Sequence, residues 1–235
     1  MREELHRRQV LGLLPGLLAG CAALRDLPSP PVMDVRTQVA ALETFAGADA
    51  FRRANGIRGR VVATVAGGRR LDARFWLAPD TRRFELHHAD GRVFRLLPDG
   101  VRVEPPGASL SAASYELHCW RELLLLPLLL REARWRMRAL EPELLDGTWC
   151  QGLQLSLPLE PARAADWFEL RHDGRLKVLR YQSGFGRAPA DPREQQYPRW
   201  KSVGGVTVPA LINLVQEDRK IGTVEVRDVL LSASA

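Results

Sequence analysis

The side chains of this sequence that could do chemistry are few, and the thiols come first. Cys119 follows His118 directly, and Cys150 lies 31 positions further on. Such a group could begin a zinc site, but a fourth ligand at typical spacing is missing. His87 and His88 are adjacent, so on a strand they point to opposite faces and cannot readily chelate together. We therefore predict no metal site.

Motifs of common catalytic and cofactor sites are also missing from the sequence. It contains no nucleophile elbow, zinc-protease helix motif, phosphate loop or dinucleotide fingerprint. Ser183-Gly184-Phe185-Gly186 has the wrong spacing for a nucleophile elbow. The sequence therefore favours a binding or structural protein over an enzyme, and we expect no cofactor.

The first twenty residues have the three parts of a secretory signal peptide. Arg2, Arg7 and Arg8 supply positive charge, residues 10–19 are apolar or small, and Leu18-Ala19-Gly20-Cys21 follows. The apolar stretch is about half the roughly 20 residues that a membrane-spanning helix needs. We expect residues 1–20 to be cleaved.

Leu18-Ala19-Gly20-Cys21 also resembles the bacterial lipobox, which implies that the Cys21 thiol carries a diacylglycerol. Arg7-Arg8-Gln9-Val10-Leu11 resembles a twin-arginine export signal, although an ordinary Sec signal with adjacent arginines fits equally well. Residues 21–33 hold three prolines within four positions, which is typical of a tether between a membrane and a domain. Ala22, by analogy with known sorting rules, favours the outer membrane, with the domain facing the periplasm.

Residues 34–235 are long enough for one domain with its own core. The chain has a formal net charge of +6, mostly from arginine. This charge could suit an anionic membrane surface or simply belong to a solvated face. Nucleic acid is not an expected partner, because export separates the protein from it. In an oxidising periplasm Cys119 and Cys150 could form a disulfide, or they could remain two buried thiols.

Hydrophobic periodicity predicts a mainly β (α+β) domain. A helix is expected from Val35 to about Ala54, capped by Asp34 and ended by a left-handed turn at Asn55-Gly56. A second, very apolar helix should start after Ser111 or Ser114 and run to Leu130, with a kink at Pro127. The remaining segments alternate with a period of two and predict eleven or twelve antiparallel strands: 57–65, 70–77, 81–88, 92–97, 101–104, 134–140, 148–157, 166–171, 175–182, 199–203, 206–216 and 220–231.

The last strands carry the clearest resemblance to a known family. Tyr197-Pro198-Arg199-Trp200, Gly204-Gly205-Val206-Thr207-Val208-Pro209 and the segment 222–229 are similar to the terminal hairpins of the LolA/LolB-like lipoprotein carriers. Together with the order of elements over residues 35–232, this resemblance implies a curved antiparallel sheet of about eleven strands. Such a sheet forms a half-open barrel with a helical lid over an apolar cavity.

One feature departs from the LolB pattern. LolB carries a protruding apolar loop between early strands, whereas the turns here are short and project no leucine; the nearest substitute is the loop that holds Phe185. If the cavity exists, it should bind lipid or an acylated lipoprotein, and the membrane would be a second partner through Cys21. The alternative is a filled barrel that serves as a structural or accessory subunit of an envelope complex, with an envelope protein as partner. The residues expected to line the cavity, or otherwise to form plain core, are Phe75, Leu77, Phe84, Leu86, Phe94, Leu96, Leu125 and Leu129.

Overall fold

The computed structural model describes residues 28–65, 68–107, 109–132, 135–156, 167–182 and 193–232. Arg7, Arg8 and Cys21 lie outside these residues, as do most of the predicted loop around Phe185 and the strand ends at 134, 157 and 166. Export and acylation therefore stay predictions.

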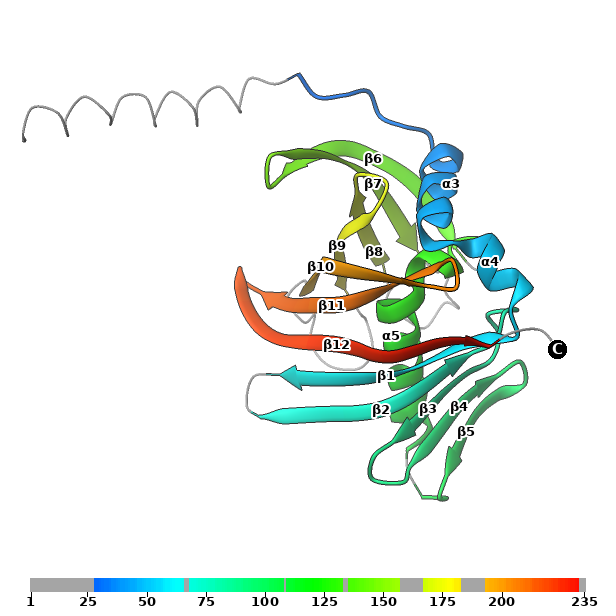
Figure 1. Cartoon of the computed structure of the whole chain (residues 1–235). Helices are drawn as coiled ribbons and strands as arrows, with labels where there is room; N and C mark the ends of the chain where they lie inside the picture. The colour runs from blue at the N-terminus through cyan, green and yellow to red at the C-terminus, as the bar shows by residue number, and fades with distance from the viewer. Residues whose placement is uncertain are drawn as a thin grey trace, which may run out of the picture.

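Twelve antiparallel strands form one sheet that does not close on itself, in the order β5-β4-β3-β2-β1-β12-β11-β10-β9-β8-β7-β6. The predicted fold class is confirmed (Figure 1). Three described helices accompany the sheet: α3 (Val35–Ala46), α4 (Ala48–Arg53) and α5 (Leu110–Leu129). The strands are β1 (Gly56–Val65), β2 (Arg69–Leu77), β3 (Phe84–His88), β4 (Val93–Leu97), β5 (Gly100–Glu104), β6 (Arg136–Leu145), β7 (Thr148–Ser156), β8 (Trp167–His172), β9 (Leu176–Gln182), β10 (Arg193–Val203), β11 (Val206–Gln216) and β12 (Arg219–Ser232).

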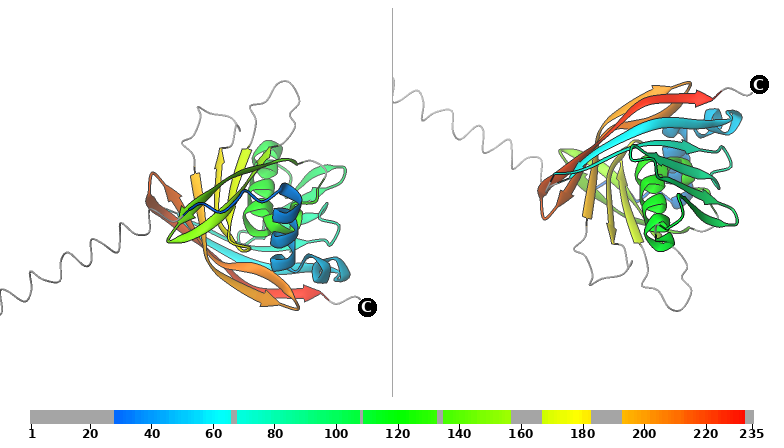
Figure 2. Two further views of the ribbon diagram at one scale, coloured as in Figure 1. Left: turned by 90° about the horizontal axis from the view of Figure 1, so that it is seen from above. Right: turned by 90° about the horizontal axis from the view of Figure 1, so that it is seen from below.

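Strand register places apolar residues in rows on the inner face of the sheet. Phe75 pairs with Leu86, which in turn pairs with Phe94 on the next strand. All three side chains are buried. Since side chains alternate along a strand, the neighbouring arginines and glutamates point outward. The views from above and below show the sheet wrapped around α5, with α3 and α4 beside one end (Figure 2).

The outer face of β6–β10 is held by ion pairs instead of a helix. Arg180 donates to Glu143, Glu169 and Glu194, which come from three different strands. The hydrogen bond to Glu143 is the main cause that raises the pKa of Arg180. Arg171 extends the network to Glu143 and Glu169. These pairs join four strands across the curved surface.

Irregular pairing bends the sheet at β10 and β11. The register shifts twice between Gln196 and Trp200, and Trp200 stands opposite Pro209. A proline cannot donate to a strand ladder, so it needs an edge or a bulge. Between Arg199 and Trp200 the extra residue lies in β11, next to Pro209, so the proline stands at a bulge of its own strand.

The helix predicted over 35–54 is in fact two helices. Asp34 caps the first as expected, and its carboxylate accepts a hydrogen bond from the Thr37 N–H. The predicted left-handed turn occurs at Gly47, with φ 70°, and not at Asn55-Gly56, because α4 ends at Ala54 in an extended conformation. Gly47 contacts the β10–β11 turn so closely that a Cβ would lie 1.8 Å from the Gly205 carbonyl oxygen. The close approach explains why the helix turns there.

Several further boundaries differ from the predictions. Strand β3 begins at Phe84 instead of residue 81, and β6 runs to Leu145 instead of ending at residue 140. The apolar helix begins at Leu110 and is capped by Ser109, not by Ser111 or Ser114, and it continues through Pro127 as a single helix. The strand expected from Arg199 starts at Arg193, six residues earlier. Its polar side chains, including Glu194 and Gln196, lie on the outer face and obscured the period of two.

A group of buried polar residues, the tether clamp, fixes the segment before α3 to the sheet. Gln151 accepts a hydrogen bond from the Met33 N–H at 2.9 Å and donates to the Pro31 carbonyl at 3.1 Å. Gln38 donates to the Met33 carbonyl, and His172 Nε2 lies 2.9 Å from Gln38 Oε1. The three clamp residues, Gln38, Gln151 and His172, are at most 9% exposed. Gln38 and Gln151 form hydrogen bonds only with backbone atoms of the tether, and His172 contacts Gln38.

We predict that the tether clamp makes stability depend on pH. Burial lowers the pKa of His172 from 6.5 to about 4, so the unfolded chain takes up a proton before the folded one does. Stability should be complete above pH 6.5 and fall as the pH drops towards 4, by roughly 3 kcal/mol in total. Urea unfolding across this range measures the slope. His172→Gln should remove most of it and leave the part due to His88, whose pKa burial also lowers.

Exposed His87 provides the matched control, since His87→Gln should leave the slope intact. An unchanged slope in His172→Gln would show that the buried imidazole does not control the pH dependence.

We also predict that Gly47 tolerates no side chain. Gly47→Ala should reduce the free energy of unfolding by roughly 3 kcal/mol, because a positive φ is strained and the added methyl group meets the Gly205 carbonyl. Gly91 has a φ of +89°, and a Cβ added there would have no atom within 4 Å, so Gly91→Ala isolates the backbone strain at about 1 kcal/mol. Equal losses in the two variants would contradict the close-contact explanation.

Candidate functional site

The residues predicted to line a cavity meet on the inner face of the sheet. Phe84 pairs with Leu96, and Leu86 pairs with Phe94. Phe94 and Leu96 are therefore the residues of β4 that face inward. Leu96 is half-buried, and the others are at most 2% exposed in one continuous core: Phe75, Leu77, Phe84, Leu86, Phe94, Leu125 and Leu129. The predicted residues on the strands and those on α5 therefore lie in the same core.

Helix α5 occupies the concave side of the sheet. Every residue from Arg121 to Leu130 is buried, and the helix packs against β3, β4 and β5 on one side and α3 and β11 on the other. A helix that is apolar on most sides needs such an enclosure. The predicted lid therefore lies inside the curve of the sheet (Figure 2). Within the described parts of the chain, no helix is long and apolar enough to cross a membrane.

A proline and a tyrosine together attach α5 to β10. Pro127 has no N–H, so the Leu123 carbonyl lacks the donor that a helix normally supplies from four residues ahead. The Tyr197 hydroxyl donates to this carbonyl at 3.1 Å and also lies 3.1 Å from Gln195 Oε1. Tyr197 is 3% exposed. The sheet thus supplies the hydrogen bond that the sequence of α5 removes.

Aromatic rings extend this attachment to α3. The bulge in β10 brings Tyr197 and Trp200 to the same face, where the rings stack with centroids 5.4 Å apart. Phe45 meets the Trp200 ring edge-on at 5.0 Å. The Trp200 indole N–H is buried and has no acceptor among the described residues. Helices α3 and α5 therefore share one aromatic support on β10.

A buried arginine attaches the other side of α5. Arg121 is 3% exposed, and its Nε donates to the Thr81 carbonyl at 3.1 Å while the guanidinium pairs with Glu132. Thr81 lies in the turn between β2 and β3 and has a φ of 60°, which is strained for a β-branched residue. Helix α5 is thus bound by polar contacts to both halves of the sheet.

The remaining sequence candidates are dispersed. Cys119 lies half-buried on α5 and Cys150 is buried in β7, and the structure holds two thiols in place of a disulfide. His87 is exposed while His88 is buried against Phe94, so their side chains point to opposite faces as predicted. The described residues include no group of three or more His, Cys, Asp or Glu side chains that could hold a metal.

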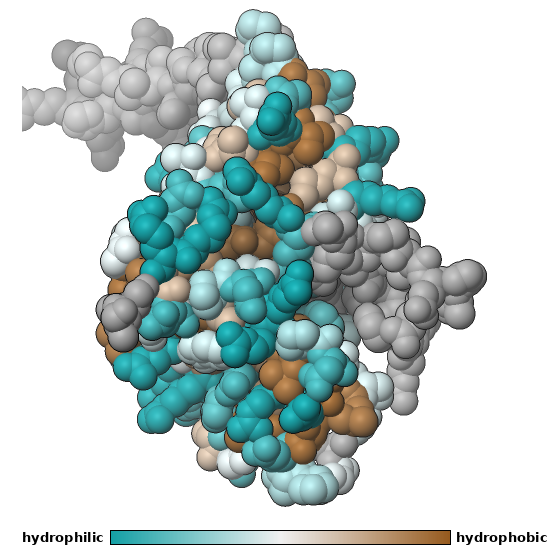
Figure 3. Space-filling view, turned by 90° about the vertical axis from the view of Figure 1, so that its right-hand side faces the viewer, coloured by the Kyte–Doolittle hydropathy of each residue, from teal (hydrophilic) through white to brown (hydrophobic). Residues whose placement is uncertain are grey.

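Large apolar side chains gather inside, and few are exposed. Those that are exposed in the described part of the chain are Val32, Leu110 and Leu230. Figure 3 shows hydrophilic residues spread over one side of the molecule, with smaller hydrophobic areas between them. Sequence reasoning placed the apolar set in the buried core, and its role in ligand binding stays a prediction. It missed Tyr197, Gln195 and Arg121. The proline inside α5 was the available signal that a partner for the Leu123 carbonyl had to exist.

Comparisons with known proteins concern the fold. No protein-family model matches the sequence, and no curated protein does. A LolA superfamily protein from Nitrosomonas europaea superposes with a TM-score of 0.56 at 9% identity, covering 87% of this chain and 95% of that one. A DUF1329 family protein from Desulfovibrio piger gives 0.47 at 13% identity, covering 83% and 93%. An outer membrane lipoprotein-sorting protein domain from Vibrio parahaemolyticus gives 0.48 at 11% identity, covering 84% and 94%.

Only the first of these structures, with its TM-score of 0.56, supports a statement about the fold. At 9% sequence identity it shows a similar architecture and says nothing about activity. The superposition covers most of both chains, and in this chain the described strands form an open, curved antiparallel sheet with a helix in its concave side (Figure 2). The chain therefore has a fold similar to that of the LolA superfamily protein from Nitrosomonas europaea.

Proposed function

We propose that this protein is a lipid-anchored lipoprotein of the bacterial cell envelope, facing the periplasm and held in the outer membrane through Cys21. Its ligand is apolar: the acyl chains of a lipid or of an acylated lipoprotein, which it carries or localises. The ligand lies between the inner face of β2–β4 and α5. The single observation that supports this most is the enclosure of the apolar C-terminal part of α5, residues 123–129, by a sheet with two free edges.

Helix α5 offers the surface that an acyl chain would need. Its leucines already form, with the phenylalanines of β2–β4, a continuous apolar contact. An acyl chain gains about 0.8 kcal/mol for each methylene removed from water. A chain of ordinary length could therefore replace the contacts of α5, provided that the helix shifts. The polar contacts of Tyr197 and Arg121 oppose this shift and keep the empty protein closed.

A second function has its own support. The described lining residues are packed against α5 with almost no exposure, as expected for a filled barrel. In that case the protein is a non-catalytic accessory subunit of an envelope complex, and an envelope protein is its partner. The two proposals differ in whether α5 can be displaced.

We predict that acylated protein purified from membranes retains lipid. Organic extraction followed by mass spectrometry should yield acyl lipid in near-equimolar amount, beyond the diacylglycerol bound to Cys21. Intact-protein mass spectrometry measures the Cys21 modification separately. Repeated extraction without lipid would favour the accessory subunit, and an unmodified Cys21 would contradict the anchor while leaving ligand binding untouched.

We further predict that Tyr197→Phe strengthens ligand binding. Loss of the hydroxyl leaves the Leu123 carbonyl without its donor and destabilises the docked helix by about 1 kcal/mol. If the helix must move to admit a ligand, the apparent affinity for a fluorescent fatty acid should rise about fivefold. Ser111→Ala removes an exposed hydroxyl from the same helix and should leave the affinity unchanged. A less stable Tyr197→Phe protein with unaltered affinity would mean that α5 stays in place.

A further inference from the structure

The outer face of the sheet carries a row of basic side chains that breaks a rule of strand pairing. Arg227, Arg60, Arg74 and His87 are direct cross-strand neighbours on β12, β1, β2 and β3. Like charges in directly opposed positions destabilise a sheet. Departures from such local rules without a structural gain occur mainly at functional sites. We call these four residues the basic row.

Three members of the basic row are held in place by carboxylates. Arg60 makes two hydrogen bonds to Asp72, of 2.8 and 2.6 Å. His87 Nε2 lies 2.9 Å from Glu85, and Arg227 pairs with Glu225. These contacts orient the basic groups before any ligand arrives.

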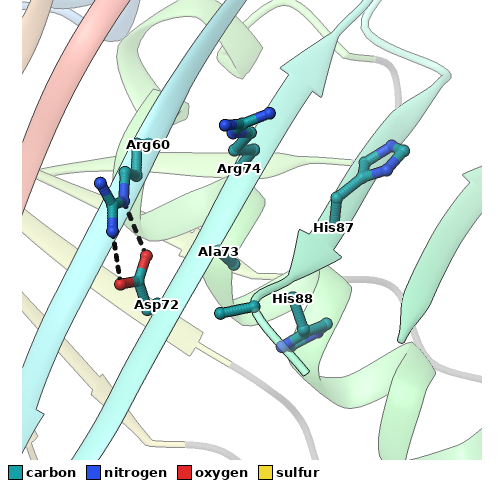
Figure 4. Close-up of a pocket in the computed structure, with 7 residues that line it drawn as sticks. Arg60, Asp72, Ala73, Arg74, His87 and His88 are labelled. Carbon is teal, nitrogen blue, oxygen red and sulfur yellow. Dashed lines mark hydrogen bonds and ion pairs between the residues drawn. The ribbon is translucent and has the colours of Figure 1, made fainter. Parts of the chain in front are cut away.

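Arg74 differs from its neighbours, because it is exposed and makes no hydrogen bond or ion pair with the described residues. Figure 4 shows it between Arg60 and His87, on the strand that separates them, while His88 turns away. Its guanidinium retains all of its donors. In the basic row it is the group that has no partner of its own.

A pocket of about 290 Å³ lies beside Arg74, and Arg60, Asp72 and His87 line it. Ala73, His88 and Ala89 complete the lining of this pocket. Hydrogen bonds from Arg60 hold the pKa of Asp72 below its ordinary value, and Arg70 approaches the same carboxylate at 3.7 Å. Two guanidinium groups thus meet one carboxylate, and the pocket lining contains two arginines, Arg60 and Arg74, against the single carboxylate of Asp72.

We propose that the basic row binds a phosphate group, either inorganic phosphate or the headgroup of an anionic phospholipid. The planar guanidinium of Arg74 donates two parallel hydrogen bonds to phosphate oxygens, a geometry that lysine does not offer. Arg60 stands on one side and adds charge and donors, and the His87 imidazole lines the other side. This site lies on the opposite face of the sheet from α5 and does not depend on the proposed acyl ligand.

The experiment uses the mature acylated protein in neutral maltoside micelles. Either inorganic phosphate is added to the solution or phosphatidylglycerol is added to the micelles, and NMR follows the arginine Nε–Hε signals. The Arg74 and Arg60 signals should shift to saturation with at least one probe, and added salt should weaken the effect. The probe that acts identifies the source of the phosphate. If neither probe shifts Arg74, the proposal is wrong.

Two variants distinguish a specific phosphate site from a general effect of net charge. In Arg74→Gln the affinity reported by Arg60 should fall about tenfold. Arg102 is exposed and paired with Asp99 on the same half of the sheet, so Arg102→Gln should leave the affinity unchanged. An equal loss in both variants would show that only net charge attracts the phosphate and would overturn the proposal.

Discussion

The burial of one apolar helix is the constraint on which the rest of the structure depends. Residues 123–129 of α5 are six leucines and a proline, and all of them are buried, so a surface must surround this part of the helix. A flat sheet covers only one side, whereas a curled sheet of twelve strands covers most of them. The bulges in β10 and β11 and the ion pairs on the outer face support this curvature. The glycine turn at residue 47 positions the helices beside the sheet.

Much of this architecture could be predicted from the sequence, because period-two alternation marks strands with one buried face. Phe75, Leu86 and Phe94 stand in the expected core, and the strands predicted over 81–88, 92–97 and 101–104 are found as neighbours in this order. Boundaries failed where a long-range contact decided them. Gly47 ends α3 because of a carbonyl more than 150 positions away, and no local pattern reports such a contact.

The candidate site was predictable in its apolar part and not in its polar part. Hydrophobic side chains show their position by periodicity, so the core residues of the candidate site could be chosen before the fold was known. Tyr197, Arg121 and Gln151 act through backbone carbonyls and amides of distant segments. Backbone groups are the same at every position, so nothing in the sequence of Leu123, Thr81 or Pro31 identifies the partner. Only Pro127 leaves a local trace, because it removes a donor that must be replaced.

The two free edges of the sheet have a mechanical consequence. No ladder of hydrogen bonds joins β5 to β6, so the circumference is not fixed as it is in a closed barrel. The sheet can flatten or tighten by small changes of twist at each strand, and every existing strand pair survives. A ligand of variable width would then be accommodated by small changes at each of the eleven strand–strand interfaces, and no strand pair would have to break.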